Sequence, residues 1–531
     1  MIACAFPLST VARAGVDARA GRRAVSIEGS RGWRSLPSTG RERRLPDAVG
    51  GFLGELNPLE RRLLDDIADG RLQDHSLLTA ALVAGGVEDD EELCYYQARA
   101  AELLAELRVE TRLNGSPFER AQTIFEFLHR RVLFAGYDLA YTDLRLVLDE
   151  GRYNCVSASV LFGFLAGECG LRTSLLETTG HAMCRLGLPD GSIDVESTCA
   201  DWFRLMSDPA TQERRVRAMV GGAASQPLPL REVGTAEVAA MIYYNRGVDL
   251  LGEKRFAEAA AANAKALRLD VRNRTIRGNL LATINNWAIV ESARNRFAEA
   301  RDLLARGMAI DPTYETFGVN WVHVHHQWAA RLCDEERFAD ALALLTAAAR
   351  QTPQVSGLGQ IRVEIYRRWA RSAYEHEGMR AALSLLNEAR HACANASDVR
   401  LAEAIELNEW SLAHVAEGRM EAALELYDVA LARQPDSSLL RENRLAVLLR
   451  WAEEAICRNE YAEGIRRLHF RAPMEPAPAE VVENLRHAYV QWSAQLAGKG
   501  RLREAIEIER RAKADPILKR AATTAAFGSS R

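Results

Sequence analysis

Hydrophobic and polar residues alternate with a helical period in the part of the chain that follows residue 50. Apolar residues recur about every 3.6 positions there. This spacing predicts amphipathic helices over residues 56–70, 88–110 and 116–132. Polar residues at their starts supply N-terminal caps, namely Asn57, Asp89 or Asp90, and Ser116.

The spacing changes in residues 152–199. A short extended segment leads to Cys155, and the apolar residues after it share one face of a predicted buried helix: Val156, Val160, Leu161, Phe164 and Leu165. Three short runs follow, separated by Gly or by Pro-Asp-Gly. These runs predict strands of an antiparallel hairpin over residues 173–180, 181–188 and 192–199.

From Thr235 onward the pattern repeats with a period of 41 residues. Six tryptophans mark the period: Trp287, Trp328, Trp369, Trp410, Trp451 and Trp492. A bulky apolar residue follows each at the tenth position: Phe297, Phe338, Met379, Met420, Tyr461 and Leu502. A small residue comes three positions later: Ala300, Ala341, Ala382, Ala423, Gly464 and Ala505. An earlier copy without tryptophan contains Phe256 and Ala259, so the array has seven units.

Each unit resembles the tetratricopeptide repeat (TPR), in which small residues let two antiparallel helices approach closely and a proline ends the second helix. Pro312, Pro353 and Pro435 match that stop, whereas the fourth copy has Ala394. The usual period is about 34 residues, and the extra length here corresponds to about two helical turns. We expect these turns in the first helix of each pair and expect the tryptophans to be structural. Such a solenoid binds a protein or peptide on its concave face.

Composition and charge exclude several other classes of protein. The chain of 531 residues is 48% hydrophobic and 26% charged, which is typical of a globular protein with more than one domain. A net charge of -4 favours neither nucleic acid nor anionic membrane as a partner. Nine cysteines without a CxxC pair indicate reduced thiols, and with no secretory signal they predict a cytoplasmic location. No nucleotide-binding motif is present, and we predict no cofactor.

These patterns divide the chain into five regions: an arm rich in arginine over residues 1–50, an α+β domain over 51–220, a linker over 221–234, an all-α repeat array over 235–519, and a tail over 520–531. The arm is predicted to be disordered because it has few apolar residues and no helical period, and the tail is predicted to be disordered as well. His323, His326 and Cys333 recur on one predicted helix, but the acidic partner usual in zinc helices is missing, so we predict no metal site.

The candidate chemistry centres on Cys155. A thiol at a helix N-terminus faces the positive end of the helix dipole and free backbone N–H groups, which favour a thiolate and an oxyanion. The alternative is an ordinary buried cysteine. His181 opens one predicted strand, and Asp194 and Glu196 lie in the next. A thiol, an imidazole and a carboxylate are the groups that nucleophilic catalysis by cysteine needs.

This order of residues resembles the transglutaminase-like superfamily, which shares the papain-like arrangement. NCVSASVLF matches its cysteine block, GHAMCRL its histidine block and DVEST its acidic block. The resemblance covers residues 58–220 and implies Cys155 as nucleophile and His181 as base. It does not decide whether Glu196 or Asp194 is the acidic residue that orients the imidazole of His181. We favour Glu196, because a four-residue loop from Gly187 to Asp190 would place it opposite His181.

The resemblance implies attack on an amide or acyl carbon, with hydrolysis of a peptide or isopeptide bond as the main hypothesis and amine transfer as a variant. The alternative is a protein-binding scaffold whose thiol site is vestigial. Reactivity of Cys155 discriminates between the two.

Overall fold

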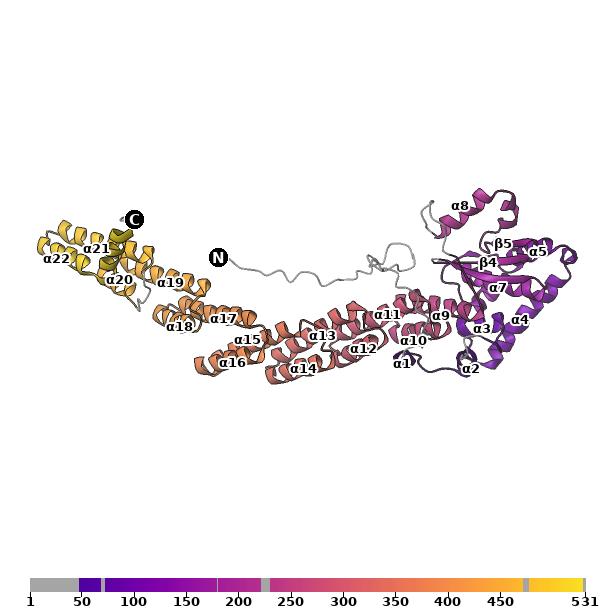
Figure 1. Ribbon diagram of the computed structural model, residues 1–531, viewed down its shortest axis with the longest axis horizontal. Coiled ribbons are helices and arrows are strands. Elements are labelled where there is room, and N and C mark those ends of the chain that lie inside the picture. The colour runs from indigo at the N-terminus through magenta and orange to yellow at the C-terminus, as the bar shows by residue number, and fades with distance from the viewer. Residues whose placement is uncertain (1–46, 68–71, 179, 221–229, 471–476, 529–531) are drawn as a thin grey trace. The chain divides into compact units, whose positions relative to one another are not determined.

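The structure is a computed structural model that describes residues 47–67, 72–178, 180–220, 230–470 and 477–528 (Figure 1). Most of the predicted N-terminal arm and the first part of the predicted linker lie outside these residues. The chain forms two compact units. The first unit contains Met1–Ala293 and Ala298–Phe317, and the second contains Arg294–Phe297 and Gly318–Arg531.

The N-terminal part of the first unit combines helices with two small sheets. Its helices are α1 (Asp47–Gly50), α2 (Pro58–Asp66), α3 (Leu77–Gly85), α4 (Asp90–Arg108), α5 (Pro117–Arg131), α6 (Leu144–Glu150), α7 (Cys155–Glu168) and α8 (Pro209–Val220), with 3₁₀ turns at Thr111–Asn114 and Trp202–Ser207. Its strands are β1 (Gly136–Tyr137), β2 (Arg152–Tyr153), β3 (Arg172–Thr178), β4 (His181–Leu188), β5 (Gly191–Val195) and β6 (Arg231–Val233). The three predicted helices correspond to α2, α4 and α5.

The predicted caps are confirmed, with Asp89 rather than Asp90 in front of α4. The side chains of Asn57, Asp89 and Ser116 each accept a hydrogen bond from the third backbone N–H of the helix that follows. For Asn57 and Ser116, the glutamate side chain at that third position also accepts a hydrogen bond from the backbone N–H of the cap residue, which completes a capping box. Local sequence therefore decides where these helices begin.

Four strands form an antiparallel sheet in the order β5-β4-β3-β6, and β1 pairs with β2 in parallel. Figure 1 shows α7 beside this sheet, and α7 contacts β3 and β4 as well as α3 and α5. The first nine residues of α7 are all buried. The helix is therefore buried as predicted, but the prediction that its apolar residues share a single face is wrong. Phe162, outside that face, is fully buried, whereas Phe164 is only partly buried.

The structure also differs from the predicted linker and tail. Residues 231–233 form β6 at the edge of the sheet, because Leu175 in β3 pairs with Val233. Residues 520–528 continue α23 (Pro516–Gly528) instead of forming an unstructured tail. The predicted boundary at 221–234 does not separate the two compact units, because the first helix pairs of the array belong to the first unit.

Helix pairs make up the array. Their first helices are α9 (Thr235–Gly252), α11 (Arg274–Ala293), α13 (Glu315–Asp334), α15 (Leu358–His376), α17 (Ala396–Ala416), α19 (Ser438–Cys457) and α21 (Ala479–Gly498). Their second helices are α10 (Phe256–Leu269), α12 (Phe297–Ile310), α14 (Phe338–Gln351), α16 (Met379–Ala392), α18 (Met420–Arg433), α20 (Tyr461–Leu468) and α22 (Leu502–Ala514). From α11 on, the first helices have 19 to 21 residues and the second have at most 14. The prediction that the extra turns lie in the first helix is confirmed.

The turn within each pair uses a left-handed residue that recurs with the same period. It is Lys254, Asn295, Glu336, Gly418, Asn459 and Gly500, with φ between 58° and 76°. In the fourth pair the left-handed residue is Gly378, one position later. A left-handed residue lets a helix end and the chain reverse, and glycine and asparagine adopt it most readily.

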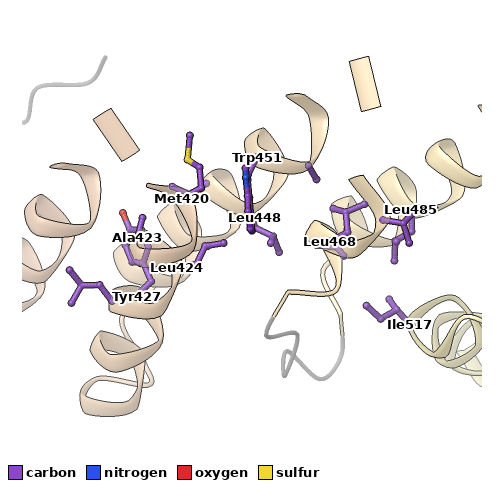
Figure 2. Packing of buried hydrophobic residues seen from close by; sticks show 14 of the residues in the cluster. Met420, Ala423, Leu424, Tyr427, Leu448, Trp451, Leu468, Leu485 and Ile517 are labelled. Atoms are coloured by element: carbon purple, nitrogen blue, oxygen red, sulfur yellow. The ribbon is translucent and has the colours of Figure 1, made fainter. Parts of the chain in front are cut away.

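The periodic aromatic and small residues pack where neighbouring pairs meet. The Phe297 ring stacks on Trp328 with centroids 6.0 Å apart, and Phe338 stacks on Trp369 at 5.8 Å. Trp410 and Trp451 belong to the buried cluster that Figure 2 shows around α18 to α21. Ala423 in the same cluster is fully buried. These four tryptophans are therefore structural, as predicted.

Enlarging a buried alanine at such a contact should destabilise the array. We expect Ala423→Leu to lower the free energy of unfolding by about 1–3 kcal/mol, because added methyl groups meet a filled interior. Ala432→Leu on the exposed side of α18 is the matched control and should change it by less than about 0.5 kcal/mol. Urea unfolding of the full chain measures both values. Equal effects of the two variants would contradict the close packing of the pairs.

Candidate active site

The N-terminus of α7 presents Cys155. The preceding strand β2 is extended and pairs with β1, and the chain turns into a helix at Asn154. Cys155 is buried, with 7% of its surface exposed. Its thiol lies close enough to His181 and Tyr137 to raise the pKa of both side chains. The thiol therefore has an imidazole and a phenol in its neighbourhood.

His181 lies at the first position of β4 and is buried between the thiol and a carboxylate. Its Nε2 is 2.5 Å from Oε2 of Glu196, which leaves Nδ1 for Cys155. Burial by itself would lower the pKa of His181. The hydrogen bonds with Cys155 and Glu196 and the charges of both outweigh burial and raise the pKa of His181 to about 10. The arrangement favours an imidazolium.

The Glu196 carboxylate is fully buried, and both of its oxygens are occupied. Oε2 faces His181, and Oε1 accepts hydrogen bonds from the backbone N–H of Thr198 at 3.0 Å and from its hydroxyl at 2.6 Å. Three hydrogen bonds thus hold the carboxylate in one orientation against the imidazole. Sequence reasoning used Thr198 only to align the acidic block and missed its contact with Glu196.

Asp194, the other candidate acid, belongs to a different ion pair. It lies directly opposite Arg185 in the β4–β5 register, and the Arg185 guanidinium donates to both of its oxygens at 2.7 and 3.0 Å. Both side chains are about one third exposed. The structure thus places Glu196, and not Asp194, beside His181.

The predicted strand register, in which a loop from Gly187 to Asp190 places Glu196 opposite His181, is nevertheless wrong. Leu188 pairs with Gly191, so the hairpin turn contains only Pro189 and Asp190 instead of the expected four residues. Proline suits such a turn, and Gly191 has φ 145°, which a residue with a side chain rarely adopts. Strand β5 then ends at Val195, and a turn from Glu196 to Cys199 follows it. The contact between Glu196 and His181 is therefore made beyond the strand.

Asn154, the residue before Cys155, is a helix cap. Its Oδ1 accepts hydrogen bonds from the N–H groups of Val156 and Ser157, at 2.9 and 3.0 Å. Its Nδ2 donates to the Leu139 carbonyl at 3.1 Å and to the Thr142 hydroxyl at 2.5 Å. The side chain has no atom left for a substrate, and it uses two of the backbone N–H groups that the sequence assigned to an oxyanion.

The cap is supported by the first helix of the repeat array. The Thr142 hydroxyl that receives Asn154 also accepts a hydrogen bond from Asn245 Nδ2 in α9, at 3.1 Å. Nearby in the same unit, buried Glu60 of α2 accepts hydrogen bonds from Tyr243 and Lys265. The first helix pair therefore helps to hold the thiol domain together.

Tyr137 was not among the residues selected from the sequence. It lies in β1 directly opposite Tyr153, whose ring centroid is 6.1 Å away, and burial together with the charge of Cys155 raises its pKa. Its side chain is half exposed (48%), in contrast to the thiol and the imidazole. No sequence motif marks Tyr137, because the pairing of β1 with β2 brings it near Cys155.

The other cysteines of the domain have different surroundings. Cys184 is fully buried and donates to the Ser159 carbonyl at 3.2 Å, and burial raises its pKa to about 12. Burial also raises the pKa of Cys169, at the far end of α7, and of Cys199. Among these three thiols and Cys155, only Cys155 meets a histidine.

The histidine cluster of α13 lines a surface hollow of about 370 Å³ together with residues of α15. Burial lowers the pKa of His323, as does the neighbouring His326, and burial raises the pKa of Cys333. Within the described residues, no group of three or more His, Cys, Asp or Glu side chains is arranged to hold a metal ion. None of the described helices is long and apolar enough to cross a membrane.

No family model and no curated protein matches the chain. Among solved structures, a tetratricopeptide repeat protein from Parabacteroides merdae is 12% identical, with 54% of this chain and 98% of that chain covered and a TM-score of 0.17. The quorum sensor NprR from B. thuringiensis is 13% identical, with 59% and 96% covered and a TM-score of 0.18. Human IFIT1, in a dimer with m7Gppp-AAAA, is 14% identical, with 88% and 99% covered and a TM-score of 0.14. TM-scores this low say nothing about the function of this chain. The TPR-like architecture is inferred from the chain's own helix pairs.

Proposed function

We propose that the N-terminal part of this protein is a cysteine-dependent acyl-transfer enzyme of the transglutaminase-like kind, which hydrolyses a peptide or isopeptide bond. The single observation that carries the proposal is the buried row Cys155–His181–Glu196, in which a thiol at a helix N-terminus meets an imidazole that a fully buried carboxylate orients. A structural cysteine requires neither of these partners.

In the proposed reaction, the Cys155 proton passes to His181 and the thiolate attacks the carbonyl carbon. A C–S bond forms, and the π electron pair of the carbonyl moves to its oxygen. When this pair returns, the C–N bond breaks and His181 gives its proton to the leaving amine. A water molecule, which loses a proton to His181, then attacks the thioester and releases the acid and the thiol. An amine in place of water would give the transferase variant.

The TPR-like helix pairs are proposed to bind a protein or peptide partner and present it to the thiol domain. This role rests on the repeat architecture alone. The second candidate function is that of a protein-binding scaffold, in which the helix pairs bind a partner and Cys155 is inert. It is favoured by the size of the array, which takes up more than half of the chain.

Limiting iodoacetamide at pH 6, followed by peptide mass mapping, distinguishes the two functions. We expect selective alkylation of Cys155, with Cys184 and Cys199 as internal controls because burial raises the pKa of both. Exposed Cys94 and Cys457 control for access to the reagent. Labelling that follows exposure, with Cys94 and Cys457 ahead of Cys155, would contradict the enzyme and leave the scaffold.

A further inference from the structure

The turn that carries Glu196 lies beyond the sheet, so strand pairing does not hold it in place. Strand β5 ends at Val195, and the turn closes with a hydrogen bond from the Cys199 N–H to the Glu196 carbonyl at 3.2 Å. The two hydrogen bonds from Thr198 to the carboxylate are made within the same turn. They orient the carboxylate relative to its own backbone. The place of the turn beside His181 depends on contacts with other elements.

Two helices contact Ser197, the residue that follows Glu196. The His129 imidazole, in the last turn of α5, donates from Nε2 to the Ser197 carbonyl at 3.1 Å. A carbonyl oxygen only accepts hydrogen bonds, so Nε2 carries the ring proton. Ser197 is fully buried, and its hydroxyl lies 3.3 Å from the Ser159 hydroxyl in α7, the helix that begins at Cys155. The backbone and the side chain of Ser197 are thus both tied to elements distant in the chain.

His129 also contacts the strand that leads to the thiol. Its ring meets the ring of Tyr153 in β2 edge-on, with centroids 6.1 Å apart, and it packs against Phe125 at 4.6 Å. Tyr153 lies two residues before Cys155. Burial lowers the pKa of His129, so the ring is neutral near pH 7 and keeps a single N–H to donate. One imidazole therefore connects the strand before the thiol with the turn that carries the acid.

We infer that His129 is a positioning residue that holds the turn of Glu196 where its carboxylate meets His181. This inference rests on the proposed acyl-transfer function. His129 acts through the Ser197 backbone and not on the reacting groups. Without its N–H, the Ser197 carbonyl loses a buried hydrogen bond and the turn is free to shift. A shift on the order of 1 Å weakens the hydrogen bond between His181 and Glu196. The imidazolium that keeps Cys155 ionised is then less stable.

Two substitutions separate the hydrogen bond of His129 from the bulk of its ring. His129→Leu and His129→Gln both replace the ring with a side chain of similar size, but only glutamine keeps an N–H donor. The measurement is the rate of Cys155 alkylation by iodoacetamide in the full chain, at pH 6 and at pH 9. We expect His129→Leu to react about tenfold more slowly than wild type at pH 6, because a small displacement weakens the imidazolium. At pH 9 the thiol ionises without help, and the two rates should converge.

His129→Gln is the matched control and should stay within about threefold of wild type at both pH values, because its amide can donate to the same carbonyl. Urea unfolding of each variant accompanies the rates. A merely structural contact would lower the unfolding free energy of His129→Leu and leave its alkylation rate at pH 6 unchanged, which would overturn the inference. An equal fall in both variants would overturn it as well, since the donor would then make no difference.

A third variant covers the case in which His129→Leu does not fold. His129→Phe lacks the donor but keeps a ring against Tyr153, and the same tenfold fall at pH 6 is expected of it, on the order of the effect of a small misplacement. If wild-type Cys155 is not selectively alkylated at pH 6, the proposed function itself fails and the inference with it. That result appears in the wild type, before any variant is compared.

Discussion

His181→Ala is expected to abolish acyl transfer and to reduce alkylation of Cys155 at pH 6 by about 10²-fold. A thiol with the ordinary pKa of about 8.5 is only about 0.3% thiolate at this pH, and His181 is the group placed to accept the proton. The measurement is the rate of iodoacetamide labelling at pH 6 and at pH 9. The rates of wild type and variant should converge at pH 9, because the variant thiol ionises there without help.

His75→Ala provides a matched control in the same unit. His75 Nδ1 lies 2.7 Å from Asp66, so this substitution also removes a histidine from a tight pair with a carboxylate. It leaves Cys155 and its partners intact and should not alter labelling. Unchanged labelling in His181→Ala at pH 6 would show that the imidazole does not activate the thiol, and the scaffold would then be the better account of the chain.

Glu196→Gln is expected to lower both stability and activity, because it removes a buried charge and leaves its partner in place. Loss of one partner of a buried pair costs about 3–5 kcal/mol of unfolding free energy. The loss of the orienting carboxylate in a comparable triad lowers the catalytic rate on the order of 10⁴-fold. Urea unfolding and the rate of Cys155 acylation measure the two effects.

The stability effect of Glu196→Gln should depend on pH with a defined sign. The pKa of His181 is raised to about 10 in the folded protein, above its ordinary value near 6.5. The stabilisation from its charged partners is therefore fully present below about pH 6.5 and is lost as the pH rises through 10. The difference in unfolding free energy between wild type and Glu196→Gln should thus be largest near pH 6 and should shrink toward pH 10.

Asp194→Asn is the control for this series. It breaks a partly exposed ion pair with Arg185 and should cost less than about 1 kcal/mol, with activity retained. If Asp194→Asn abolished acylation and Glu196→Gln did not, the third residue would be Asp194. A constant stability difference across this pH range would contradict the coupling of His181 to Glu196.

The register of the β4–β5 hairpin shows why a correct residue can be selected with a wrong geometry. Strand parity allows both Asp194 and Glu196 on the face of His181, and turn chemistry favoured a four-residue loop. The structure instead has a two-residue turn, and Glu196 reaches His181 through the chain reversal after Val195. Sequence rules describe regular strands, and this contact lies where the strand has ended.

Several features were determined by sequence alone, because they depend on residues close together in the chain. They include the caps at Asn57 and Ser116, the start of α7 at Cys155, the 41-residue period and the long first helix of each pair. A helix end needs only a polar side chain within three residues, and a repeat places the same side chain at each contact. Such features do not require knowledge of the fold.

Tertiary structure alone decided which groups surround the thiol. It put Glu196 rather than Asp194 against His181 and turned Asn154 into a cap that Thr142 and Asn245 support. These partners are far apart in the chain. Their distances follow from how α7, the sheet and the first helix pair pack together, and local sequence patterns do not contain that information.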